Sequence, residues 1–153
     1  MLIANGMEPV VFTIKSMAVQ NTIMLVALGV VIFFVAFAFV KRSPKHILVS
    51  FMWLIGVLGF FNSPLFGFSQ VTVQPQGIKV EYGILSLRNT VLPIDTPWEI
   101  KSHVSGIRRL KKVYTLKIGN HESMRVKSRK DIELLEEIGK TIDRMRKIVQ
   151  SRG

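Results

Sequence analysis

The sequence predicts a membrane α-hairpin joined to a small α+β domain. Two transmembrane helices come first, and a small antiparallel β-barrel or sheet closed by a C-terminal amphipathic helix follows them. Three observations predict this class. Two apolar segments lie close together near the N-terminus, apolar and polar residues alternate from about residue 69, and the last segment repeats apolar residues at spacings of three and four. A length of 153 residues is enough for an anchor and one modest domain.

The charged residues divide the chain in the same way. The net charge is +11, and from residue 63 onward 17 Lys and Arg face 9 Asp and Glu, a difference of +8. No charged side chain lies between Lys45 and Lys79. An apolar anchor and a basic domain in one chain account for this distribution. Because the chain has no cysteine, disulfides, thiolate metal sites and thiol nucleophiles are excluded.

The first apolar segment, residues 23–40, holds 18 residues without a charge. As a helix it would measure ~27 Å, close to the thickness of a bilayer's hydrocarbon core. The second segment, residues 47–61, continues uncharged to Phe68 and is rich in aromatic residues at its end, which is typical of a membrane interface. A re-entrant segment is the alternative for this second span. Pro64 is expected to end its helix.

The turn between the two segments, residues 41–46, is so short that the helices must pack antiparallel. Both ends of the hairpin then lie on the same side of the membrane. Small residues in the two segments are candidates for close helix contact. They are Gly29, Ala36, Ser50, Gly56 and Gly59.

Four parts follow from these boundaries. They are an N-terminal lead over residues 1–22, the hairpin over residues 23–62, an aromatic interfacial linker over residues 63–68 and a basic domain over residues 69–153. Within the lead, the stretch from Met7 to Lys15 is open to three interpretations. It is a short interfacial helix, an interfacial strand or a loosely ordered tail.

Alternating residues predict the strands of the basic domain. We expect strands over residues 70–73, 78–82, 85–88, 98–104, 113–118 and 124–127. The stretch from Val91 to Pro97, with two prolines, is expected to be irregular. The terminal helix begins after Ser128, whose hydroxyl can cap it with Asp131 three residues on. Its apolar face is expected to pack on the sheet, with a free partner-binding face as the alternative. That face comprises Ile132, Leu135, Ile138, Ile142, Met145 and Val149.

This order of elements resembles the bacterial pleckstrin-homology-like (PH-like) membrane proteins. The likeness is carried by the runs 71–73, 77–83, 98–100 and 128–131, which read VTV, GIKVEYG, WEI and SRKD, and by Ile132, Leu135 and Ile138 after them. It covers residues 69–149 and is a likeness of pattern without a catalytic signature. The irregular stretch from Leu92 to Pro97 departs from it. The resemblance implies a partly opened barrel closed by the C-terminal helix, and a binding or assembly module.

Residues suited to catalysis or metal binding do not cluster. His46, His103 and His121 are not at metal-binding spacings, so neither a metal nor a cofactor is expected. Asp95 and Glu99 flank Trp98 and are the one conceivable acid–base pair. We therefore expect no enzyme, and keep a small membrane enzyme or transporter component with a site near Asp95 and Trp98 as the alternative.

The basic clusters are the candidate binding residues. They are Arg108, Arg109, Lys111, Lys112, Arg125, Lys127, Arg129 and Lys130. Anionic lipid headgroups attract such residues by ~1 kcal/mol each near the surface. Other interpretations are an acidic face of a partner membrane protein, a small anion sensed by Arg108 and Arg109, or a solvated surface. Nucleic acid is not expected, because no aromatic side chains interleave with the cations as a stacking platform.

The sequence therefore predicts a non-enzymatic, membrane-anchored accessory, assembly or scaffold protein. Its partners would be membrane lipids and a membrane protein or further copies of the chain. We expect a multi-pass protein with two spans in a bacterial cell membrane. Two features favour opposite orientations in the membrane. The turn carries three cations and each flank of the hairpin carries one, which favours a cytoplasmic turn. The basic domain favours the opposite, because the cytoplasmic leaflet is anionic, and we adopt a cytoplasmic basic domain.

Overall fold

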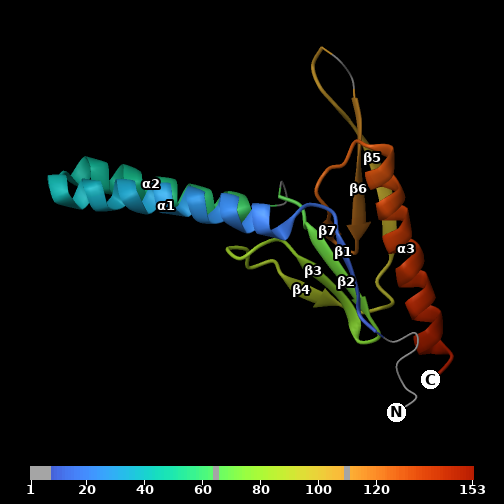
Figure 1. Ribbon diagram of the computed structural model, residues 1–153. Coiled ribbons are helices and arrows are strands. Elements are labelled where there is room, and N and C mark those ends of the chain that lie inside the picture. The colour runs from blue at the N-terminus through green and yellow to red at the C-terminus, as the bar shows by residue number, and fades with distance from the viewer. Residues whose placement is uncertain (1–7, 64–65, 109–110) are drawn as a thin grey trace.

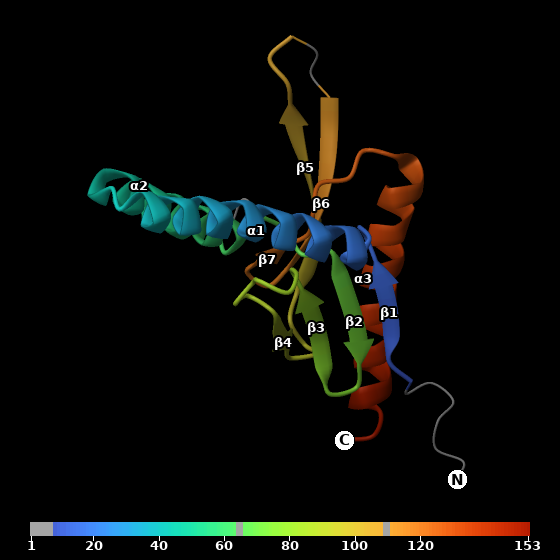
Figure 2. The same cartoon turned by 60° about the vertical axis from the view of Figure 1, so that its left-hand side comes forward.

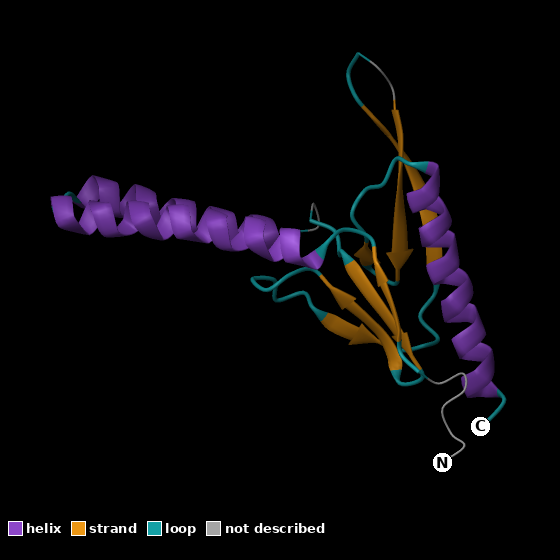
Figure 3. Ribbon diagram, in the orientation of Figure 1, coloured by secondary structure: helices purple, strands orange, loops and turns teal. Residues whose placement is uncertain are grey.

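In the computed structural model, which describes residues 8–63, 66–108 and 111–153, a long helical hairpin projects from a two-sheet domain (Figures 1 and 3). The hairpin consists of α1 (Met17–Lys41) and α2 (Pro44–Phe61). The rest, which we call the head, contains β1 (Val10–Thr13), β2 (Gln70–Gln74), β3 (Gly77–Glu81), β4 (Thr90–Leu92), β5 (Trp98–Ser105), β6 (Lys111–Ile118), β7 (His121–Glu122) and α3 (Arg129–Gln150).

Both hairpin helices are long and apolar enough to cross a membrane, by length and composition. At 1.5 Å per residue, α1 measures ~37 Å and α2 ~27 Å. Helix α1 begins at Met17, because the Ser16 hydroxyl caps it by accepting a hydrogen bond from the Val19 amide. Helix α2 begins with Pro44 in its first turn, where the missing amide proton costs nothing.

Most of the predicted small-residue contacts between the helices are absent. A side chain added at Gly29, Gly56 or Gly59 would have no atom within 4 Å, so these glycines face outward. Ser50 is the exception. It is buried, and its hydroxyl donates to the Phe34 carbonyl across the hairpin at 3.4 Å.

The head has two antiparallel sheets, with strand orders β1-β2-β3-β4 and β5-β6-β7. A single residue before β2 joins them: the Phe68 amide donates to the Glu122 carbonyl, and the Met124 amide donates to the Phe68 carbonyl, both at 3.0 Å. In the described part of the chain the strands do not close into a barrel. The antiparallel strands and the terminal helix are confirmed, whereas a closed barrel is not.

Strand β1 precedes the hairpin in the chain and pairs with β2, which follows it. The register joins Val10 to Val73 and Thr13 to Gln70. The helical hairpin is therefore an insertion between two paired strands of the head. For Val10–Thr13 the strand interpretation of the lead is correct; residues 1–7 lie outside the described residues. Because β1 and β2 are adjacent and antiparallel, the two ends of the hairpin are attached side by side at the same end of these strands (Figure 2).

The predicted strand over residues 85–88 is wrong. This stretch is part of a loop, residues 82–89, and β4 forms in the stretch that was expected to be irregular. The reason is the Asn89 side chain, which accepts from the Tyr82 amide at 2.7 Å and donates to the Gly83 carbonyl at 3.0 Å. These bonds satisfy backbone groups that a further strand would have used.

The last predicted strand, residues 124–127, is also not a continuous strand. Strand β7 forms earlier, at His121–Glu122, and Val126 makes a separate bridge to Tyr114. Ser123, between β7 and Val126, pairs with Phe68 instead. This pairing interrupts the strand between Glu122 and Val126.

Helix α3 packs on the sheets, as predicted. Its buried residues include Leu135, Ile138, Ile142 and Met145, and they join a core built from both sheets. The Ser128 hydroxyl accepts from the Asp131 amide at 3.1 Å, which confirms the predicted cap. Buried Gly139 lies against the Trp98 ring. The terminal helix is therefore a structural element of the head.

Candidate membrane-facing surface

The loop between β3 and β4, residues 82–89, is attached to the base of the hairpin by three amide side chains. We call this set of contacts the joint. The Asn21 side chain of α1 accepts from the Ile84 amide at 2.9 Å, and Asn62, just after α2, accepts from the Leu87 amide at 2.7 Å. The third contact is from Gln20, whose amide donates to the Tyr82 carbonyl at 3.3 Å.

Arg88 adds a charged contact, which we include in the joint. Its guanidinium donates to the Ser63 carbonyl at 2.8 Å and to the Phe66 carbonyl at 3.3 Å. It also lies over the Tyr82 ring, 4.5 Å from the ring centre. A positive charge beside the carbonyls that follow α2 is favourable, because the C-terminal end of a helix is partly negative.

Close packing adds to the joint. Met24 of α1 is fully buried against Gly83, where an added Cβ would lie 2.5 Å from the methionine sulfur. Gly83 has φ +138°, a conformation that other residues rarely adopt. The joint therefore combines hydrogen bonds, a charge and a close apolar contact, and it fixes the head to the hairpin.

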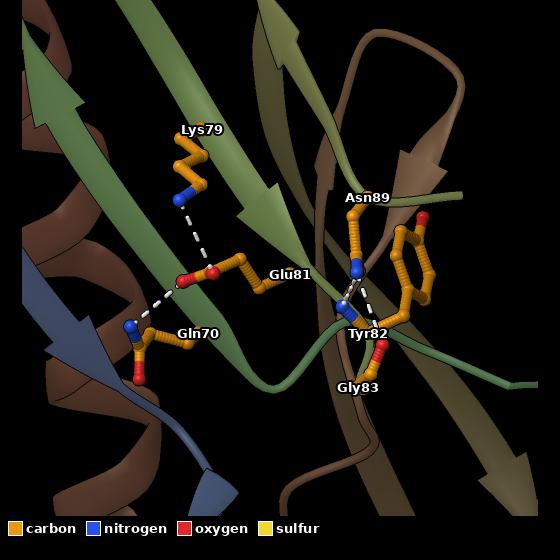
Figure 4. A network of polar contacts seen from close by, with 6 residues as sticks. All are labelled: Gln70, Lys79, Glu81, Tyr82, Gly83 and Asn89. Carbon is orange, nitrogen blue, oxygen red and sulfur yellow. Dashed lines mark hydrogen bonds and ion pairs between the residues drawn. The ribbon is translucent and has the colours of Figure 1, made fainter. Parts of the chain in front are cut away.

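Polar networks continue from the joint into the sheet (Figure 4). In a separate network, the Glu81 carboxylate accepts from Gln70 at 2.8 Å and pairs with Lys79 at 3.3 Å. The Tyr82 hydroxyl contacts the His121 ring nitrogen Nδ1 at 2.7 Å. Burial raises the pKa of Tyr82 to about 12. Burial, and then the positive charge of Arg88, lowers the pKa of His121 below 6.5.

We expect the free energy of unfolding to fall in mild acid because of His121. The lowered pKa means that the unfolded chain takes up a proton at His121 before the folded chain does. This contribution to stability is complete above the ordinary pKa of 6.5 and is lost as the pH falls through the lowered value. Urea unfolding at about pH 7.5 and about pH 5.5 measures it, one unit either side of the ordinary pKa. The loss should be smaller in His121→Gln; an equal loss would contradict the assignment.

The predicted binding residues gather at one edge of the head. Arg108 is exposed at the turn between β5 and β6, Lys111 and Lys112 are exposed where β6 begins, and Arg109 lies outside the described residues. The Tyr114–Val126 bridge brings the segment after β7 alongside this end of β6. We call the described cations at this edge the basic edge. They are Arg108, Lys111, Lys112, Arg125, Lys127, Arg129 and Lys130.

Nearly all cations of the basic edge lack an anionic partner. Arg129 pairs with Glu133 at 3.3 Å, and the others form no ion pair with the residues that the structure describes. All of them are exposed. The positive potential of this edge is therefore available to an external anionic surface.

At the alternative site, Asp95, Trp98 and Glu99 each have different surroundings and form no acid–base pair. The Trp98 indole donates to Asp143 of α3 at 3.0 Å, while Asp95 is exposed. Glu99, the second predicted acid, lies near Lys101 at 3.7 Å. Trp98 thus serves packing between β5 and α3. Across the described residues no three potential metal ligands come together.

The joint was not anticipated from the sequence. A usable signal was present: Gln20, Asn21 and Asn62 are uncharged amides at the ends of apolar helices, where they can bind backbone groups of a neighbouring segment. Which segment they bind depends on the position of the β3–β4 loop, which was predicted as a strand.

Comparison with protein-family models, with curated proteins and with solved structures finds no match to this chain.

Proposed function

We propose that this chain is a non-enzymatic, membrane-anchored accessory protein whose basic edge binds anionic lipid headgroups. The hairpin crosses the membrane twice, and the head remains on one side with a PH-like arrangement of two sheets and a closing helix. The observation that carries the proposal is the basic edge itself: a group of exposed cations, nearly all without an anionic partner, in a domain fixed to a hairpin of membrane-spanning length.

The exposed surface of the hairpin supports the membrane part of the proposal. Large apolar side chains face outward along both helices, among them Ile32 at 54%, Trp53 at 67% and Ile55 at 70% exposure. A surface of this kind is unfavourable in water and favourable in lipid. The hairpin projects away from the head, so the head leaves this surface uncovered (Figure 1).

The direction of the β5–β6 hairpin supports the lipid part. This β-hairpin extends sideways, across the direction of α1 and α2, in both views (Figures 1 and 2). In a membrane crossed by α1 and α2, the β5–β6 hairpin with its basic tip would therefore extend parallel to the membrane surface. Each cation held near anionic lipid contributes ~1 kcal/mol.

A dye attached through Ile107→Cys tests this proposal, because Ile107 is fully exposed at the tip. The full chain is placed in nanodiscs of phosphatidylcholine, or of equal parts phosphatidylcholine and phosphatidylglycerol. We expect the emission of an environment-sensitive dye to shift to the blue only with the anionic lipid. High salt should reverse the shift, because it screens exposed charges.

Two charge-reversal variants complete the test. Lys111→Glu with Lys112→Glu should abolish the blue shift. Arg144→Glu with Lys147→Glu changes the net charge equally, at exposed positions on α3 outside the basic edge, and should leave it intact. Equal emission in the two lipids would refute headgroup binding and favour an acidic face of a partner protein.

The assembly role is supported by the outward-facing glycines of the hairpin, which allow close approach of another helix. We therefore infer that the chain joins a larger membrane complex, with a membrane-protein partner or further copies of itself. Co-migration with a partner in mild detergent is the expected result. Recovery as a monomer alone at native abundance would refute this role.

A further inference from the structure

Two large apolar side chains on the β3–β4 loop are exposed rather than packed into the core of the head. Leu87 is 93% exposed and Ile84 is 61% exposed. A single exposed apolar residue is common on protein surfaces, but these two lie three positions apart on one short loop. Between them, Ser86 is buried, so the loop has an inward side and an outward apolar side.

The loop is held in place beside the hairpin. The amides of the two residues concerned, Ile84 and Leu87, are the ones that Asn21 and Asn62 bind, so each apolar side chain starts from a backbone position fixed to the base of a helix. Figure 1 shows the loop reaching from the head along the base of the hairpin, on the side toward which α1 and α2 project.

Aromatic residues mark the same level of the hairpin. Phe60 and Phe61 at the end of α2 and Phe66 just beyond it form a cluster with ring centres 5.4–6.1 Å apart. Aromatic side chains gather where a membrane meets water. Asn62 directly follows Phe61 in the chain and binds the Leu87 amide, so Leu87 lies near the level of this cluster.

The one charge on the loop does not oppose contact with lipid. Arg88 is turned toward the Ser63 and Phe66 carbonyls and the Tyr82 ring, away from the outward apolar side. The exposed part of the loop next to the hairpin therefore presents Ile84 and Leu87 without a free charge beside them.

We propose that the β3–β4 loop is a second membrane contact, in which Ile84 and Leu87 insert among the lipids at the base of the hairpin. The occupant of this apolar surface is the bilayer that surrounds α1 and α2, which makes the inference dependent on the hairpin's crossing a membrane. The contact would hold the head at a fixed depth and tilt, because the joint makes the loop and the hairpin one rigid unit.

Quenching of a dye by lipids that carry a nitroxide near the headgroup tests this contact. The full chain with Leu87→Cys is labelled and placed in nanodiscs, and Leu87→Cys does not perturb the core because its side chain is exposed. Gln76→Cys is the matched control, since Gln76 is exposed in the turn between β2 and β3, at the opposite end of the strands from the joint. Ile55→Cys, on the exposed surface of α2, reports insertion of the hairpin.

We expect the dye at Leu87 to be quenched several-fold more than the dye at Gln76, in both zwitterionic and anionic discs. Quenching at Ile55 with none at Leu87 would overturn the loop contact and leave the membrane anchor in place. Quenching at Leu87 without a blue shift of the dye at Ile107 in anionic lipid would support the loop contact and refute headgroup binding. If neither Ile55 nor Leu87 is quenched, the anchor and the loop contact both fail.

Discussion

Replacing Gly139 with valine is expected to destabilise the head by about 3 kcal/mol, the upper part of the range for overpacked cores. Gly139 lies on the buried face of α3, and an added Cβ would overlap three atoms of the Trp98 ring. The ring cannot simply turn away, because its indole N–H is bonded to Asp143. The better helix propensity of valine, below ~1 kcal/mol, offsets only part of the clash.

Hydrogen exchange of the β6 amides in the full chain measures this effect, because these amides exchange through opening of the head. Gly56→Val is the control: nothing lies within 4 Å of an added side chain there, so the head should be unaffected. Combining Gly139→Val with Trp98→Leu should cost less than the sum of the two single changes, because the smaller side chain makes room. Additive losses would contradict the proposed clash.

Replacing Arg88 with methionine is expected to loosen the joint by about 2 kcal/mol, typical of a hydrogen bond from a charged group. Methionine keeps an apolar side chain over the Tyr82 ring but cannot donate to the Ser63 and Phe66 carbonyls. The segment after α2 would then lose both guanidinium bonds to the loop and keep the bond between Asn62 and the Leu87 amide. Arg88→Lys keeps the charge but not the planar fork that reaches both carbonyls, and an intermediate effect is expected.

The distance between spin labels at Ser43→Cys and Gln76→Cys measures the loosening. One label lies at the turn of the helical hairpin, and the other lies at the far end of the sheet. Arg88→Met should broaden the distribution of distances while β6 amides stay protected. A distribution as narrow as that of the parent chain would mean that the joint does not depend on Arg88.

Elements with a strong period were predictable from the sequence. The hairpin, β2, β3, β5, β6 and α3 each follow an apolar pattern long enough to identify them, and Ser128 marks the start of α3 correctly. In these elements local preference and tertiary packing favour the same structure, as consistent sequences do.

Elements that depend on a distant partner were not predictable. Strand β1 has four residues and acquires its role only by pairing with β2, from which the whole hairpin separates it in the chain. The loop over residues 82–89 alternates like a strand, but the Asn89 side chain and Gly83 end the ladder. Leu87 belongs to this alternating pattern, yet its side chain faces outward. The pattern alone does not distinguish an apolar side chain that packs in the core from one that is exposed.

The same division applies to the candidate sites. The basic edge could be listed from the sequence, but its gathering depends on the bridge between Tyr114 and Val126. The joint depends on amide side chains from both helices meeting one loop. Contacts of that kind have no local sequence signal, since Asn and Gln bind any backbone group that lies within reach.

The central claim is that the hairpin crosses the membrane twice and leaves the whole head on one side. Pairing of β1 with β2 requires an even number of crossings. Because the chain has no cysteine, Ser43→Cys at the hairpin turn and Gln76→Cys on the head can be labelled singly in intact cells with a membrane-impermeant maleimide. We predict that only the Ser43→Cys chain is labelled, and that both are labelled once the membrane is opened. Labelling of the head variant alone would preserve the two crossings and place the head outside the cell. Labelling of both variants, or of neither, in intact cells would contradict the claim.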